Sequence, residues 1–195
     1  MINKTNTKKT VIAGLMTALG ILLPFICSHS TGLLPGNVFL PMHIPVLLCG
    51  FFCGPMYGAI SGILLPFLNS ALTSMPVLYP NAVVMSAELF TYGLMTGLIH
   101  KSTGHSKKLK HIYLSLILSL LAGRAIYGIV ASILLFLNPA AKGLSVTAAI
   151  LQGIPGIVVQ LVLIPVIVSG ILKNKTKKNA LEYDAIKMIE AREKT

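Results

Sequence analysis

The chain has 195 residues, of which 54% are hydrophobic and only 11% are charged, and its formal net charge is +11. This composition excludes an ordinary soluble domain and is typical of a membrane protein. Lys and Arg gather at Lys4–Lys9, Lys101–Lys110 and Lys173–Lys178, and Glu88 is the only Asp, Glu, Lys or Arg between the first two of these clusters. Basic clusters beside long apolar runs indicate orientation in a membrane more often than nucleic-acid binding.

The first apolar segment, Val11–Ile26, is long enough to reach most of the way across a hydrocarbon core of roughly 30 Å. It follows lysines, as a signal peptide would, but no A-x-A cleavage site accompanies it, so we expect an uncleaved first helix. A long loop is predicted at Cys27–Pro41, which contains two Pro and two Gly. His43–Cys53 is too short to cross a bilayer alone, and we predict a tilted or re-entrant second span that this loop completes.

Four more apolar segments bring the number of predicted spans to six. Basic residues concentrate in the N-terminus, in the loop between spans four and five and in the C-terminal tail, which predicts that both termini face the cytoplasm. The predicted fold is therefore an all-α membrane protein of six transmembrane helices, with a short second span. We expect one transmembrane domain over residues 1–172 and a polar cytoplasmic tail over residues 173–195. The four further spans are Pro55–Thr73, Ala82–Ile99, Ile112–Leu137 and Val146–Leu172.

Small residues mark one face of the third span. Gly54, Gly58 and Gly62 recur every four residues, and Pro66 follows at the same spacing. Such small-xxx-small stripes let helices approach closely in lipid, where hydrophobic burial gives no drive to associate. We therefore expect this face to lie against a neighbouring helix.

Glu88 and Arg124 are the two charged residues within the predicted spans. A charge at the centre of a bilayer costs from about 3 kcal/mol upward, so each of them needs a partner or a function. One interpretation is a structural ion pair that fixes the packing of spans four and five. The other is a ligand site in which Arg124 binds a carboxylate in a fork and Glu88 accepts hydrogen bonds from hydroxyl or amine donors. Both interpretations can hold at once.

Other polar residues lie in the spans or in the loop that precedes the second span. Each also has a simpler explanation: Asn37 would be solvated, His43 would lie at the outer membrane surface, and Gln152 and Gln160 would bond neighbouring helices. Since these groups avoid lipid, we expect them to converge on an interior site. The candidate substrate-binding residues are Asn37, His43, Asn69, Glu88, Tyr92, Arg124, Tyr127, Gln152 and Gln160.

No enzymatic motif occurs in the chain. It has no G-x-x-x-x-G-K-[ST] phosphate loop, no H-E-x-x-H, and no nucleophile with a plausible base and orienting acid. The three cysteines match no zinc or redox spacing, and the histidines among the lysines after span four are expected to be solvated. We therefore predict a protein that is not an enzyme and has no metal or cofactor.

The chain resembles the substrate-binding S components of energy-coupling-factor (ECF) transporters, which are bacterial vitamin importers. The resemblance covers about residues 8–172 and rests on LPMHIPVLLCGFFCGPMYGAISGILLP, on MPVLYPNAVVMSAELFTYGLMTGLIH, on the six-span plan and on the small face of span one. It implies a substrate pocket near the outer face, a transmembrane coupling subunit and two ATPase subunits. In the family an Ala-x-x-x-Ala patch on the first helix docks on the coupling subunit, and the matching residues here are Gly14 and Ala18.

The resemblance implies the substrate-binding subunit of an ATP-dependent vitamin importer in the bacterial plasma membrane. Arg124, with amides and tyrosines nearby, suits a small anion that bears hydroxyl groups. Pantothenate fits that description best, and folate, pyridoxine and queuosine precursors are alternatives. The competing hypothesis is a structural or assembly protein, or a solitary facilitator without ATPase partners, in which Glu88 and Arg124 only stabilise the fold.

Overall fold

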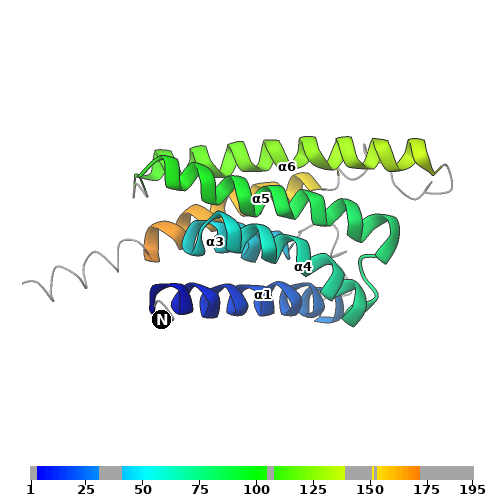
Figure 1. Ribbon diagram of the computed structural model, residues 1–195, viewed down its shortest axis with the longest axis horizontal. Helices are drawn as coiled ribbons and strands as arrows, with labels where there is room; N and C mark the ends of the chain where they lie inside the picture. Colours follow the sequence, from blue (N-terminus) through cyan, green and yellow to red (C-terminus); the bar gives the residue numbers. More distant parts are fainter. Residues whose placement is uncertain (1–3, 31–40, 105–107, 139–150, 152, 172–195) are drawn as a thin grey trace, which may run out of the picture.

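The computed structural model describes residues 4–30, 41–104, 108–138, 151 and 153–171. These residues are helical apart from short connections, and there is no strand among them (Figure 1). The helices in chain order are α1 (Lys4–Ser30), α3 (His43–Cys53), α4 (Pro55–Thr73), the short π-helical turn η1 (Leu78–Ala82), α5 (Val83–Ser102), α6 (Leu109–Leu137) and a last helix, Gly153–Ile171.

Five segments of the described chain are long and apolar enough to cross a membrane, and α3 is a shorter apolar helix beside them. This confirms the predicted all-helical membrane fold with a short second helix. The observed bounds of α3 and α4 are those that the sequence predicts. The last helix lies within the predicted sixth span, and the polar tail after it is outside the described residues.

Some predicted boundaries are wrong. The loop expected from Cys27 begins later, because α1 continues to Ser30 through a segment that contains no Gly or Pro. α6 begins at Leu109, three residues before the predicted start, since nothing in that turn opposes a helix. A turn follows α4: Ser74 has a left-handed conformation with φ of 58°, and η1 then leads into α5.

Glycines bring α3, α4 and α5 into close contact. A Cβ atom on Gly93 of α5 would overlap the backbone of Gly58 on α4, and a Cβ on Gly62 would overlap the backbone of Leu89. Gly50 on α3 faces the carbonyl oxygen of Gly93 in the same way. Backbones can approach this closely only where side chains are absent, so the prediction for the small face of the third span is confirmed at Gly58 and Gly62.

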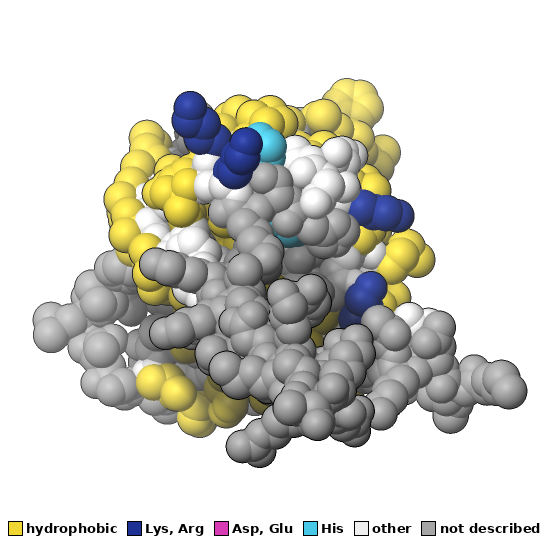
Figure 2. Space-filling view, turned by 90° about the vertical axis from the view of Figure 1, so that its left-hand side faces the viewer, with side chains coloured by type: hydrophobic (Ala, Val, Ile, Leu, Met, Phe, Trp, Pro, Cys, Tyr) yellow, Lys and Arg dark blue, Asp and Glu magenta, His cyan; other side chains and the backbone are white. Residues whose placement is uncertain are grey.

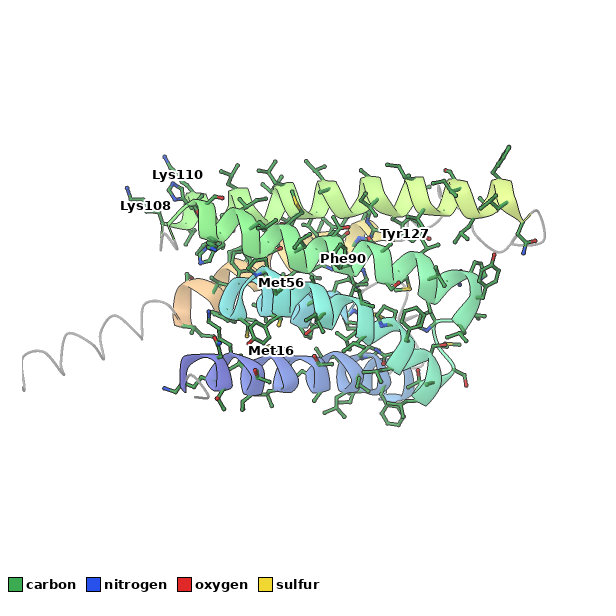
Figure 3. All side chains as sticks on the ribbon, in the orientation of Figure 1. Met16, Met56, Phe90, Lys108, Lys110 and Tyr127 are labelled. Carbon is green, nitrogen blue, oxygen red and sulfur yellow. The ribbon has the colours of Figure 1, made fainter. Side chains whose placement is uncertain are left out.

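Basic side chains lie at one end of the bundle. The start of α1, the end of α5 and the start of α6 all lie at the left of Figure 1, and Figure 2 shows Lys and Arg side chains on that face. Lys108 and Lys110 are labelled there in Figure 3. The positive-inside rule assigns such an end to the cytoplasm, which remains a prediction for this chain.

The glycine contacts lead to a stability prediction. We expect Gly93→Ala to destabilise the protein by about 1–3 kcal/mol, because the new methyl group meets the backbone of α4 and forces α4 and α5 apart. Thermal unfolding of the purified protein in detergent measures the effect. Gly128→Ala on α6 is the control, since a Cβ at that position would meet no other described helix within 4 Å, and it should unfold at or slightly above the wild-type temperature. Equal melting temperatures for the two variants would contradict the prediction.

Candidate functional site

The Glu88 carboxylate is the centre of a buried polar cluster formed by α3, α5 and α6. Its side chain is 2% exposed. Oε1 accepts a hydrogen bond from the Tyr92 hydroxyl at 2.7 Å and lies 3.1 Å from Nη1 of Arg124, while Oε2 lies 3.7 Å from Nε2 of His43. We call these four residues, His43, Glu88, Tyr92 and Arg124, the Glu88 cluster. The structure therefore brings together four residues that the sequence proposed as a site.

Arg124 on α6 connects this cluster to the last helix. Its guanidinium uses Nη1 for Glu88, and its tip lies against the backbone of Gly153, where a Cβ atom would overlap Nη2. Nε and Nη2 are buried and have no hydrogen-bond partner among the described residues. Two of the three guanidinium nitrogens therefore remain for a further acceptor, and Arg presents them in the fork geometry that suits a carboxylate.

The positions of His43 and Tyr92 depend on local packing. His43 is the first residue of α3, so this short helix begins beside the carboxylate and runs towards the basic end (Figure 1). The His43 and Tyr92 rings pack with their centroids 5.5 Å apart. Gly123 on α6 leaves room for the Tyr92 ring, because a Cβ at that position would overlap it. A glycine opposite each of two large side chains, Gly123 for Tyr92 and Gly153 for Arg124, makes the cluster sterically possible.

Other predicted site residues make different contacts. Tyr127 is buried against Val84 and Ala131 between α6 and α5, one helical turn from Arg124 (Figure 3). Asn69 is fully buried, and its Nδ2 donates to the carbonyl oxygens of Gly20 and Leu65, each at 3.2 Å, so it connects α4 to α1. Asn37 and Gln152 lie outside the described residues. The role of each of these residues in binding stays a prediction.

Two further buried polar residues lie on α5 and the last helix, nearer to the basic end of the bundle than the Glu88 cluster. Gln160 on the last helix, a predicted site residue, is 1% exposed. Thr96 on α5 is fully buried and was not predicted as a site residue. A signal for Thr96 does exist in the sequence, because Glu88, Tyr92 and Thr96 are spaced by four and so share one face of α5. Neither side chain has a hydrogen-bond partner among the described residues.

The Glu88 cluster contains one acidic and one cationic side chain that lie beside each other. Glu88 and Arg124 cancel each other's charge, which makes the burial of both affordable in a low-dielectric interior. Among the residues that the structure describes, no three His, Cys, Asp or Glu side chains come together as a metal site. The arrangement holds donors and acceptors for a polar molecule, with Arg124 as the group for an anion.

Comparison with known families decides the class of protein. The family model described as "ECF transporter, substrate-specific component" matches residues 8–168, which is most of the chain. The chain belongs to this family. No curated protein and no solved structure matches it. The resemblance inferred from the sequence is therefore confirmed, and this ECF substrate-specific component is a multi-pass membrane protein by its apolar helices.

The family assignment makes the Glu88 cluster the main candidate for a ligand site. A substrate-specific component must hold a small molecule with its own side chains. The cluster is buried and polar, and two nitrogens of Arg124 in it have no hydrogen-bond partner among the described residues. The sequence left two interpretations open for Glu88 and Arg124, and their 3.1 Å separation shows that they form an ion pair.

The ion pair leads to a second stability prediction. Arg124→Ala leaves the Glu88 carboxylate buried without its cation, and we expect a loss of about 3–5 kcal/mol of folding free energy. Adding Glu88→Gln removes the uncompensated charge, so the double variant should recover most of that loss. Thermal unfolding in detergent compares the three proteins. A double variant as unstable as Arg124→Ala would show that the buried charge is not the cause.

Proposed function

We propose that this chain is the substrate-binding subunit of an ECF-type, ATP-dependent importer, and that the Glu88 cluster is where it binds a small carboxylate-bearing vitamin. The observation that carries the proposal is the state of Arg124. Its guanidinium is held by Glu88 through one nitrogen only, with Nε and Nη2 unpaired among the described residues. A purely structural ion pair would use more of the guanidinium, since unpaired buried donors cost stability.

The chemistry of the cluster points to the substrate class. Arg124 supplies donors for a carboxylate, while Glu88 and His43 can pair with hydroxyl or amine groups of the same molecule. Pantothenate, a small acid with hydroxyl groups and an amide, is our first choice of substrate. Folate is an acid as well, whereas pyridoxine and queuosine precursors would use the hydroxyl and amine contacts more than Arg124.

The family also supports a proposal for the membrane, the orientation and the partner subunits of this chain. We place the protein in the bacterial plasma membrane with both termini in the cytoplasm, because the basic residues of α1, α5 and α6 lie at one end of the bundle. Partners are a transmembrane coupling subunit and two ATPase subunits, which supply the energy that this chain cannot. The substrate then enters from the end of the bundle opposite these basic residues.

The direct test is binding by the isolated chain. Purified protein in detergent, without ATP or partners, should bind pantothenate in isothermal titration calorimetry. The Arg124→Ala, Glu88→Gln double variant should keep its fold but bind about 10–150-fold more weakly, because the charge-assisted hydrogen bonds to the carboxylate are lost. A mass spectrum of small molecules that co-purify with wild type identifies the natural ligand.

Two results would contradict this proposal. Full recovery of both stability and affinity in the double variant would show that the ion pair is structural and that the substrate lies elsewhere. If wild type binds no candidate and no small molecule co-purifies, a structural protein or a solitary facilitator becomes the better explanation.

The outer face of α1 supports the partner proposal. Gly14 and Ala18 are exposed, and no described atom lies within 4 Å of a Cβ built on Gly14. The opposite face of the helix packs on α3 and α4, with Ala13 buried and Thr17 bonded to Ser61 at 3.1 Å. Gly14 therefore packs against no other described helix and Ala18 is exposed, and a stripe of small residues suits the close approach of a partner helix.

Bulky residues at this stripe should block docking and leave binding intact. We expect Gly14→Leu with Ala18→Leu to keep the ligand affinity of the isolated chain, because the stripe is not packed against the bundle, but to lose co-purification with the coupling subunit and uptake by cells. The control is Gly170→Leu, which adds the same bulk at an exposed, open position on the last helix. Normal uptake by the Gly14, Ala18 variant would rule out the docking role, and lost affinity would show internal packing.

A further inference from the structure

Two buried polar side chains outside the Glu88 cluster have no hydrogen-bond partner among the described residues. They are Gln160, with both Nε2 and Oε1 unpaired, and Thr96, with its hydroxyl unpaired. Their exposed fractions are 1% and 0%. Burying an amide or a hydroxyl without a hydrogen bond is unfavourable, so two such groups in one core indicate that each binds a partner outside the described residues.

Thr96 and Gln160 lie at the same depth. α5 and the last helix run in the same direction (Figure 1), and Arg124 contacts Glu88 on α5 and the backbone of Gly153 on the last helix. Glu88 and Gly153 therefore mark a common level. Thr96 follows Glu88 by eight residues and Gln160 follows Gly153 by seven, which is roughly 12 and 10 Å along the two helices.

One glycine and one aliphatic side chain of the last helix lie between these two levels: Gly156 is buried, and Ile157 packs against buried hydrophobic residues of the core. Gly153, Gly156 and Gln160 are all buried and share one face of the helix at spacings of three and four. Side chains in an α-helix lean towards its N-terminus, so the Gln160 amide leans towards the level of Arg124. The guanidinium and the amide are thus separated along the helix axis by roughly 10 Å or less, with Gly156 on the face between them.

We infer that Thr96 and Gln160 form a second, uncharged layer of the ligand site, which binds an amide or hydroxyl group of a ligand whose carboxylate is bound at Arg124. This inference rests on the proposed function. A primary amide donates and accepts, and a hydroxyl does both as well, so the layer pairs with a neutral group that itself has a donor and an acceptor. The two layers select an elongated acid with such a group roughly 10 Å or less from its carboxylate, and they disfavour a short hydroxy acid.

The test separates ligand binding from folding at Gln160. Gln160→Met keeps the length of the side chain and removes the amide. We expect the ligand-free variant to melt in detergent at or above the wild-type temperature, because two unpaired polar atoms leave the core. Its affinity for pantothenate, measured by calorimetry on the full chain, should fall about tenfold through the loss of hydrogen bonds to the ligand. Thr96→Val should act in the same direction.

Ser61→Ala is the control, since it also removes a buried polar group but lies outside the proposed site. The Ser61 hydroxyl is bonded to the Thr17 hydroxyl at 3.1 Å and lies 3.6 Å from the Cys49 sulfur, so this variant should lose stability and keep its affinity for pantothenate. A melting temperature several degrees below wild type for Gln160→Met would show a structural hydrogen bond and overturn the inference. Unchanged affinity in Gln160→Met, with wild type binding pantothenate, would also overturn it and leave the proposed function standing. If wild type binds none of pantothenate, folate and pyridoxine, the proposed function fails and this inference fails with it.

Discussion

The structure depends on how one buried carboxylate is kept charged inside an apolar bundle. Glu88 is 2% exposed and lies between helices that carry no other acid within the described spans. Three groups from three helices face it: Arg124 at 3.1 Å, the Tyr92 hydroxyl at 2.7 Å and His43 at 3.7 Å. A buried charge with fewer partners would unfold the bundle or lose its charge, so the relative positions of α3, α5 and α6 are tied to this one side chain.

Glycines make this arrangement geometrically possible. Gly58, Gly62 and Gly93 let α4 and α5 approach until their backbones touch, and this sets the register of α5 against its neighbours. Gly123 and Gly153 then leave the space that the Tyr92 ring and the Arg124 guanidinium occupy. In lipid, where apolar burial does not hold helices together, close backbone packing and a shared polar group are the available sources of specificity.

The two faces of α1 differ in a way that suits a subunit of a larger assembly. The inner face is occupied by bonds and contacts to α3 and α4, including those of Thr17 with Ser61 and of Gly20 with Leu65. The outer face carries Gly14 and Ala18, which are both exposed, and a Cβ built on Gly14 would meet no other helix of the described chain. A ligand site centred on α3, α5, α6 and the last helix therefore leaves α1 available for a partner, so binding and docking can use different parts of one small protein.

Hydropathy and charge segregation in the sequence were sufficient to predict the membrane class, the all-helical fold and the bounds of α3 and α4, because these depend on local composition and on Gly and Pro. The pairing of Glu88 with Arg124 was also predictable, since a lone charge in a span needs a partner. Only the tertiary structure showed that His43 and Tyr92 join this pair, that Asn69 bonds to α1, and that Thr96 and Gln160 are buried without a hydrogen-bond partner among the described residues. These facts depend on the register between helices, which the glycine contacts determine and which no local pattern in the chain contains.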